Sequence, residues 1–290
     1  MKLSIVIPVL NQLDMFRATY DMLRKVTNTT EHQVEFIVID NGCDEPIDIP
    51  DCMGADIYRN EESIGVYPTF KQGMEIATGD IVAFFHSDLV VWEENWNVRV
   101  MELFARHANM GLVGFIGSNE IDSSGGRGSG TTSNFQGLSL ITKSPVATQL
   151  MWVGSPASAH GGTSAGFSPA AVVDGCAMIV RREAWNQIGY QEGFPPHHFY
   201  DRLISTQMLQ YNWQVGVLGI ACDHFSGQTT VREDKYHRMA EKWSRANLNE
   251  DLWQKDSNGN YNWDATIYLA AEKMWLSEYR ERKHLVPVKI

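Results

Sequence analysis

The chain has 290 residues, of which 43% are hydrophobic and 20% charged, so it can bury the core of one large domain or of one domain with an appendage. Its formal net charge of −11 argues against broad binding to the phosphates of extended nucleic acid, because that binding needs a basic surface, and leaves only local basic patches open. No apolar run reaches the about 18 residues of a membrane span, and the first predicted strand begins almost at Met1, so we expect neither a membrane anchor nor a secretory signal.

Strands and helices alternate in the first half of the chain. Short apolar runs rich in β-branched residues predict strands at residues 3–9, 34–39, 56–59 and 81–85. Apolar residues at helical spacing predict helices at 13–26 and 67–77. Because parallel strands need crossover connections, this alternation predicts a mostly parallel central sheet flanked by helices. The continuous apolarity of the first two strands predicts that both faces of the sheet are covered.

The second half is less regular. A helix is predicted at 96–107, a strand at 112–116, a strand at 172–180, helices at 182–188 and 199–211, and a strand at 215–221. Residues 118–171 are rich in Gly, Ser, Thr and Asn and are predicted to form loops. Helices at 233–246 and 264–283 are expected to dock on the body through Trp243, Tyr268 and Trp275.

The cysteines point to a reducing compartment. The chain has four, with no CxxC pair among them: Cys43, Cys52, Cys176 and Cys222. We expect buried, reduced thiols rather than disulfides or zinc ligands. This suits the cytoplasm, with any membrane contact being peripheral.

Polar residues directly after the predicted strands are the candidates for a site, because ligands of such sheets bind beyond the carboxyl ends of the strands. His86 and Asp88, two residues apart, can both face a ligand and seat Mg²⁺ or Mn²⁺, with the imidazole shifting the preference toward Mn²⁺. From spacing alone, a turn-capping Asp88 with a packed His86 explains them equally well. Asp40 can bind a base or ribose, although an Asx-turn explains it slightly better by itself. The first strand is not followed by GxGxxG, which excludes a dehydrogenase.

Five segments, in this order and spacing, resemble glycosyltransferase family 2, whose members are inverting enzymes of the GT-A type: residues 3–11, 36–42, 59–81, 86–88 and 173–190. The resemblance covers roughly residues 1–230 and implies a Rossmann-like α/β fold of the GT-A type there. It divides this domain into a nucleotide-sugar-binding half at 1–117, flexible Gly/Ser-rich loops at 118–171 and an acceptor half at 172–230. Residues 231–290 match no pattern and are predicted to be a C-terminal helical extension.

The resemblance implies a metal site and a nucleotide site. Asp88, with contributions from His86 and His224, would bind Mn²⁺ or Mg²⁺ bridging the diphosphate of the donor. His86 stands where the family often has a carboxylate, which makes strict dependence on metal an open question, and a lone histidine such as His224 is more often a packed residue. The residues expected to contact the donor are Pro8, Asn11, Asp40, Asn60, Gly65, Lys71 and Ser87.

An inverting transfer needs a carboxylate that takes the proton from the acceptor hydroxyl. The resemblance implies that this general base is Asp201, since Phe199, Tyr200, Asp201 and Arg202 occupy the place where the family usually has Glu-Asp. Here that pair is reduced to Tyr-Asp. An aspartate near a helix N-terminus is also favoured by the helix dipole alone.

The sequence thus predicts a metal-dependent enzyme that moves a sugar from a UDP- or GDP-sugar to a glycan or another hydroxyl acceptor. One alternative is a non-catalytic module that binds a nucleotide or sugar, which His86 in place of a carboxylate would suit. The other is a nucleotidyltransferase, but those enzymes have a glycine-rich basic loop after the first strand, and residues 10–13 lack it.

Overall fold

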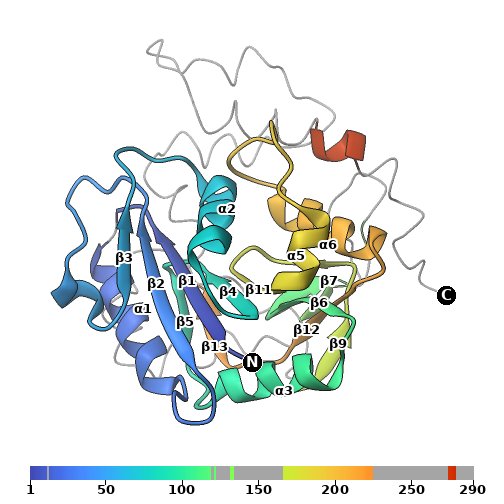
Figure 1. The fold of residues 1–290 in the computed structure, drawn as a ribbon, viewed down its shortest axis with the longest axis horizontal. Coiled ribbons are helices and arrows are strands. Elements are labelled where there is room, and N and C mark those ends of the chain that lie inside the picture. Colours follow the sequence, from blue (N-terminus) through green and yellow to red (C-terminus); the bar gives the residue numbers. More distant parts are fainter. Residues whose placement is uncertain (12, 119–120, 122–130, 134–165, 225–273, 279–290) are drawn as a thin grey trace.

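An eight-stranded sheet in the order β3-β2-β1-β4-β11-β6-β12-β9 forms the centre of the molecule (Figure 1). The computed structural model describes residues 1–11, 13–118, 121, 131–133, 166–224 and 274–278. Six strands of the sheet run in one direction, while β11 and β9 run against them. The sheet is therefore mixed and mostly parallel, as the sequence predicts.

The first half of the chain builds the parallel part of the sheet. Its strands are β1 (Leu3–Val9), β2 (Val34–Asp40), β3 (Asp56–Arg59) and β4 (Ile81–Phe85). The connections between them contain α1 (Leu13–Val26), the short η1 (Ile49–Cys52) and α2 (Val66–Ile76). All four predicted strands and both predicted helices are confirmed within a residue or so. The amphipathic and buried patterns of this half are long enough to specify their elements without tertiary information.

The second half departs from the prediction at two strands. The run at 112–116 belongs to two strands, β6 (Met110–Gly114) and β7 (Ile116–Ser118). The run at 172–180 likewise divides into β10 (Val172–Val173) and β11 (Ala177–Arg181). β11 inserts antiparallel between β4 and β6, which the prediction of a mostly parallel sheet allows but does not locate. Apolar periodicity carries no information on strand direction, and a short turn inside an apolar run does not interrupt it.

The remaining elements complete the sheet edge and two small sheets. The helices are α3 (Trp96–Arg106), α5 (Arg182–Ile188) and α6 (Tyr200–Gln210), which confirms the helices predicted at 96–107, 182–188 and 199–211. The last strands of the large sheet are β12 (Gln214–Leu218) and β9 (Phe167–Pro169). β8 (Thr131–Ser133) joins β7 and β10 in a three-stranded sheet. β5 (Leu89–Val91) pairs with β13 (Cys222–His224) in a two-stranded one.

Helices cover both faces of the large sheet. α1 and α3 contribute to one buried cluster, and α2, α5 and α6 contribute to the other (Figure 1). Alternate residues of β1 enter the two clusters: Ile5 and Ile7 face the first, and Val6 faces the second. This double burial is what the continuous apolarity of the strands predicts.

Trp275, in the helical segment 274–278, is fully buried in the second cluster, which confirms its predicted docking. Trp243, Tyr268, the helix predicted at 233–246 and most of the loops predicted at 118–171 lie outside the described residues. All four cysteines are buried free thiols, as predicted. Among the helices that the structure describes, none has the length and apolarity needed to cross a membrane.

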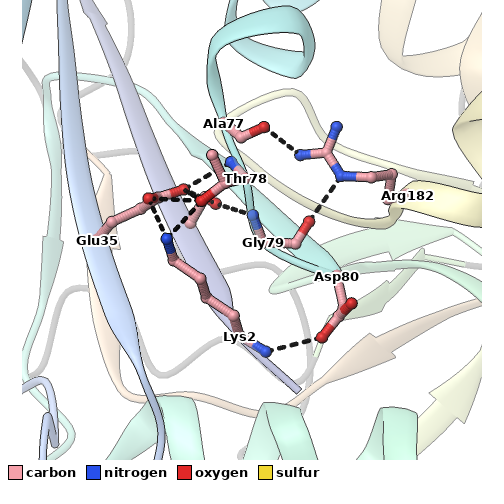
Figure 2. Close-up of polar contacts among 8 residues, drawn as sticks. Lys2, Glu35, Ala77, Thr78, Gly79, Asp80 and Arg182 are labelled. Carbon is pink, nitrogen blue, oxygen red and sulfur yellow. Dashed lines mark hydrogen bonds and ion pairs between the residues drawn. The ribbon is translucent and has the colours of Figure 1, made fainter.

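A cluster of polar side chains lies at the amino ends of β1, β2 and β4 (Figure 2). The carboxylate of Glu35 on β2 accepts hydrogen bonds from the ammonium of Lys2, the hydroxyl of Ser4 and the backbone N–H of Thr78. Burial alone would raise the pKa of Glu35, but these donors outweigh it and lower the pKa to about 2. The cluster lies at the opposite end of the strands from the predicted ligand site.

Arg182, at the start of α5, completes this end of the sheet. Its guanidinium donates to the carbonyls of Met74, Ala77 and Gly79, at distances of 2.6–2.8 Å. Figure 2 shows the bonds to Ala77 and Gly79. Those carbonyls lie at or just past the end of α2, where backbone acceptors lack partners within the helix. Arg182 therefore caps α2 and ties it to α5.

Candidate active site

The turn after β4 presents the predicted metal motif at the carboxyl end of the sheet. The backbone N–H of His86 donates to the carbonyl of Cys176 at 3.0 Å, and that of Leu89 donates to the carbonyl of His86 at 3.1 Å. The hydroxyl of Thr19 on α1 donates to the carbonyl of Ser87 at 2.7 Å. One hydrogen bond within the turn and two from other segments thus fix its backbone, and Ser87 contributes through its main chain.

The pairing of β13 with β5 brings His224 to this turn, because His224 lies opposite Leu89. Nε2 of His224 lies 3.2 Å from Oδ1 of Asp88, and Nδ1 of His86 lies 3.9 Å from the same oxygen. Donor atoms of all three side chains lie within 4.8 Å of one another. The three residues predicted as metal ligands therefore converge, although His224 is distant in the sequence.

The charges of this cluster favour cation binding. Burial lowers the pKa of His86, and the attraction of Asp88 only partly offsets it, so the imidazole is neutral at pH 7. Burial opposes ionisation of Asp88, but the adjacent His224 outweighs it and lowers the pKa of the carboxyl. A neutral imidazole and an ionised carboxylate are the forms that bind metal. Two imidazole nitrogens and one carboxylate oxygen fit Mn²⁺ better than Mg²⁺, which prefers oxygen ligands.

A second carboxylate lies beside His224. Asp174, in the turn between β10 and β11, has a carboxylate oxygen within 4.8 Å of donor atoms of Cys176 and His224. Its Oδ1 accepts the backbone N–H of Cys176 at 3.0 Å. Burial raises the pKa of the Cys176 thiol well above its ordinary value, which makes it a poor ligand at neutral pH. Asp174 is a site residue that the sequence predictions do not include; its position directly after an apolar strand was the available signal.

Helix α6 begins at the same place with Tyr200 and Asp201. The hydroxyl of Tyr200 lies 2.9 Å from Nε2 of His86. One carboxylate oxygen of Asp201 accepts the backbone N–H of Arg202 at 2.8 Å, within the first turn of the helix. Asp201 is thus adjacent to a residue that contacts the metal motif, and its role as a base stays a prediction. Tyr200 is the second site residue absent from the sequence predictions, since a tyrosine at a helix start gives no signal of its own.

Asp40, at the end of β2, holds the loop that follows it. The side chain is fully buried, and its two oxygens accept the backbone N–H groups of Cys43 at 2.8 Å and Ile47 at 3.1 Å. The guanidinium of Arg59 pairs with the same carboxylate. Burial opposes ionisation, but these donors lower the pKa of Asp40. The carboxylate therefore fixes the shape of the loop, and its predicted contact to a base stays a prediction.

The other loops at this edge of the sheet are joined to the Asp40 loop. Pro8 lies within β1, where it is opposite Ile39 of β2. Asn11, which follows β1, has a φ of 59° and accepts the backbone N–H of Asp44 at 2.8 Å. Asn60, which follows β3, donates from its side-chain amide to Asn41 at 3.1 Å. The predicted donor contacts Asn11 and Asn60 thus lie on one connected rim around the ends of β1, β2 and β3.

Two further predicted contacts are Gly65, directly before α2, and Lys71, in the middle of that helix. Gly65 has a φ of 87°, and a Cβ there would meet the Cβ of Pro196 at 2.4 Å, so only glycine allows this close approach of the two loops. The ammonium of Lys71 pairs with the carboxylate of Glu192 at 2.8 Å. The side chain of Lys71 is therefore engaged with the segment after α5.

Residues 4–189 match the model of the family described as glycosyl transferase family 2. A crystal structure of GalNAc-T7 with UDP, GalNAc and Mn²⁺ is similar at 14% identity and a TM-score of 0.57, over 77% of this chain and 43% of that one. A crystal structure of S. aureus TarS 1–349 is similar at 14% identity and a TM-score of 0.51, over 100% of this chain and 76% of that one. The chain thus spans less than half the length of the first of these proteins. The comparison with curated proteins gives no match.

Proposed function

The chain belongs to glycosyl transferase family 2, and on that premise we propose that it transfers a sugar from a nucleotide-diphosphate sugar to an acceptor hydroxyl. Its sheet has the α/β architecture of the GT-A type that the sequence resemblance implies. The observation that carries the proposal is the convergence of His86, Asp88 and His224 at the carboxyl end of that sheet, with donor atoms within 4.8 Å of one another.

His86, Asp88 and His224 would hold the divalent cation, which we propose to be Mn²⁺ because two of the three donors are imidazole nitrogens. The structure of GalNAc-T7, which contains UDP and Mn²⁺, supports this choice of metal and suggests UDP as the nucleotide. When bound, the metal would neutralise charge that develops on the leaving diphosphate. The rim that contains Asn11, Asp40 and Asn60 would bind the nucleoside, since it lies at the same end of the strands.

Asp201 would act as the general base. The helix position fixes one carboxylate oxygen through the backbone N–H of Arg202, and the neighbouring Tyr200 contacts the metal motif. A carboxylate held there can accept the proton of the acceptor hydroxyl as its oxygen attacks the anomeric carbon. Direct attack opposite the leaving diphosphate inverts that carbon, and no covalent intermediate is needed.

A thermal-shift panel of UDP- and GDP-sugars with and without Mn²⁺ tests this proposal. A donor at about 100 times its Kd adds about 2.7 kcal/mol to the free energy of unfolding, so its binding raises the melting temperature. We expect one donor to stabilise the protein with Mn²⁺, and EDTA or Asp88→Asn to abolish the effect. Asp21→Asn, which removes an exposed carboxylate on α1, is the matched control and should keep it. No stabilisation by any nucleotide sugar would contradict the proposal.

A further inference from the structure

The phenol of Tyr200 is held rigidly against the metal motif. Its side chain is only 6% exposed. The ring stacks on Tyr67, with centroids 6.2 Å apart and an interplanar angle of 16°, and it contacts Phe70 at a centroid distance of 5.3 Å. Two aromatic rings of α2 therefore restrict how the Tyr200 ring can move.

Gly175 packs against the hydroxyl end of the Tyr200 ring. A Cβ at this position would meet the hydroxyl oxygen of Tyr200 at 2.3 Å and its Cζ at 2.9 Å, closer than any real Cβ contact. The Tyr200 hydroxyl thus lies directly over the backbone of the β10–β11 turn. This packing requires glycine at position 175, and it sets the hydroxyl 2.9 Å from Nε2 of His86.

The two ring nitrogens of His86 have different surroundings. Nε2 faces the Tyr200 hydroxyl at 2.9 Å, and Nδ1 lies 3.9 Å from Oδ1 of Asp88, which is itself 3.2 Å from Nε2 of His224. Only a nitrogen without a proton can bind a metal, and a histidine ligand commonly donates the N–H of its other nitrogen to a fixed acceptor. A gap of 3.9 Å is too long for a hydrogen bond but leaves room for a cation between the two donors.

We propose that Tyr200 is a positioning residue that accepts the Nε2–H of His86 and thereby directs the lone pair of Nδ1 toward Asp88 and His224. Without this acceptor the proton can move to Nδ1, and the ring can turn, because the χ2 torsion of histidine is broad. His86 and Tyr200 come from separate parts of the chain, the turn after β4 and the start of α6, and the structure joins them by a hydrogen bond. The inference rests on the proposed function only in assuming that the bound cation serves sugar transfer; the positioning of His86 by Tyr200 does not depend on it.

The test compares Tyr200→Phe with Tyr67→Phe in two measurements that need no sugar donor. Both variants lose one phenolic oxygen from the same stack, but the Tyr67 hydroxyl accepts the backbone N–H of Gln191 instead of contacting His86. Long-range ¹H–¹⁵N spectra of the metal-free protein report the tautomer of His86, whose signals are assigned by their loss in His86→Gln. Titration followed by the electron paramagnetic resonance of free Mn²⁺ reports metal affinity.

We expect the wild type to show the Nε2–H tautomer, and Tyr200→Phe to lose it and to weaken Mn²⁺ binding by about 10-fold or more. Tyr67→Phe should change neither. The inference would be overturned by any of three results: an Nδ1–H tautomer in the wild type, an Mn²⁺ affinity of Tyr200→Phe within about twofold of wild type, or a loss of Mn²⁺ affinity in Tyr67→Phe equal to that in Tyr200→Phe.

Thermal melting shows whether the variants are folded. If Tyr200→Phe does not fold, Gly175→Ala displaces the hydroxyl from the opposite side and is expected to produce the same changes. The tautomer of the metal-free protein tests the positioning role even if the protein transfers no sugar, so failure of the proposed function and failure of this inference give different results.

Discussion

Replacing Glu35 by glutamine should destabilise the protein in a pH-dependent manner. The carboxylate of Glu35 is 19% exposed and accepts hydrogen bonds from Lys2, Ser4 and Thr78 at the amino end of the sheet (Figure 2). These donors bind the ionised form, so Glu35→Gln removes the charge that all three stabilise.

The magnitude follows from the pKa of Glu35, which is about 2 in the folded protein against an ordinary value of 4.5. At about 1.4 kcal/mol for each pKa unit, the full difference corresponds to about 3.4 kcal/mol, and screening by solvent at this partly exposed edge reduces it to about 2 kcal/mol. Since the folded pKa lies below the unfolded one, the contribution is complete above pH 4.5 and is lost as the pH falls toward 2.

Urea denaturation at several pH values from 6.5 to about 3 gives the free energy of unfolding of wild type and variant. Taking the difference between the two at each pH removes the contribution of the other titrating groups, which both proteins share. We expect Glu35→Gln to cost about 2 kcal/mol at pH 6.5, and clearly less at pH 3. Glu45→Gln, in an exposed loop, is the control and should leave stability unchanged at each pH. A difference that stays constant from pH 6.5 to 3 would refute the reasoning.

Three further substitutions test other parts of the account. Asp201→Asn should slow sugar transfer by about 100-fold or more while the donor-induced thermal shift persists; unchanged release of nucleoside diphosphate would place the base elsewhere. Arg182→Ala leaves the carbonyls at the end of α2 without their donor and should cost about 3 kcal/mol in urea denaturation, an expectation that a loss below about 0.5 kcal/mol would contradict. Asp40→Asn removes the charge that holds Arg59 and the loop after β2, and should lower the free energy of unfolding by about 2 kcal/mol. It should also weaken binding of the sugar nucleotide, as measured by calorimetry; unchanged donor affinity would exclude this loop from the nucleotide site.

The first half of the fold is readable from the sequence, because its strands and helices are long and their apolar patterns differ. The second half is readable only in part: its helices α3, α5 and α6 follow the prediction, whereas β11, β5 and β13 show what the sequence does not reveal. β11 runs antiparallel, and strand direction leaves no mark on apolar periodicity. β5 and β13 have three residues each, too few to show any period, and only their mutual pairing defines them.

The residues of the candidate site also differ in whether the sequence reveals them. Asp88 and His86 are detectable because they directly follow a buried strand, and the expectation that His224 joins them came from the family resemblance rather than from spacing. Tyr200 escapes sequence reasoning, because its contact to His86 depends on the packing of α6 against α2 and on the absence of a side chain at position 175. Contacts of this kind exist only in three dimensions.

The central claim is that this family member uses a cation held by Asp88, His86 and His224 to release a nucleoside diphosphate from a sugar nucleotide. Its most direct test is the rate of that release, with Mn²⁺ or with EDTA, for the donor that gives the largest thermal shift. We predict that the wild type with Mn²⁺ releases the nucleoside diphosphate, that EDTA stops the release, and that Asp88→Asn lowers its rate by about 100-fold or more while Asp21→Asn does not. Equal rates in wild type and Asp88→Asn would contradict the claim.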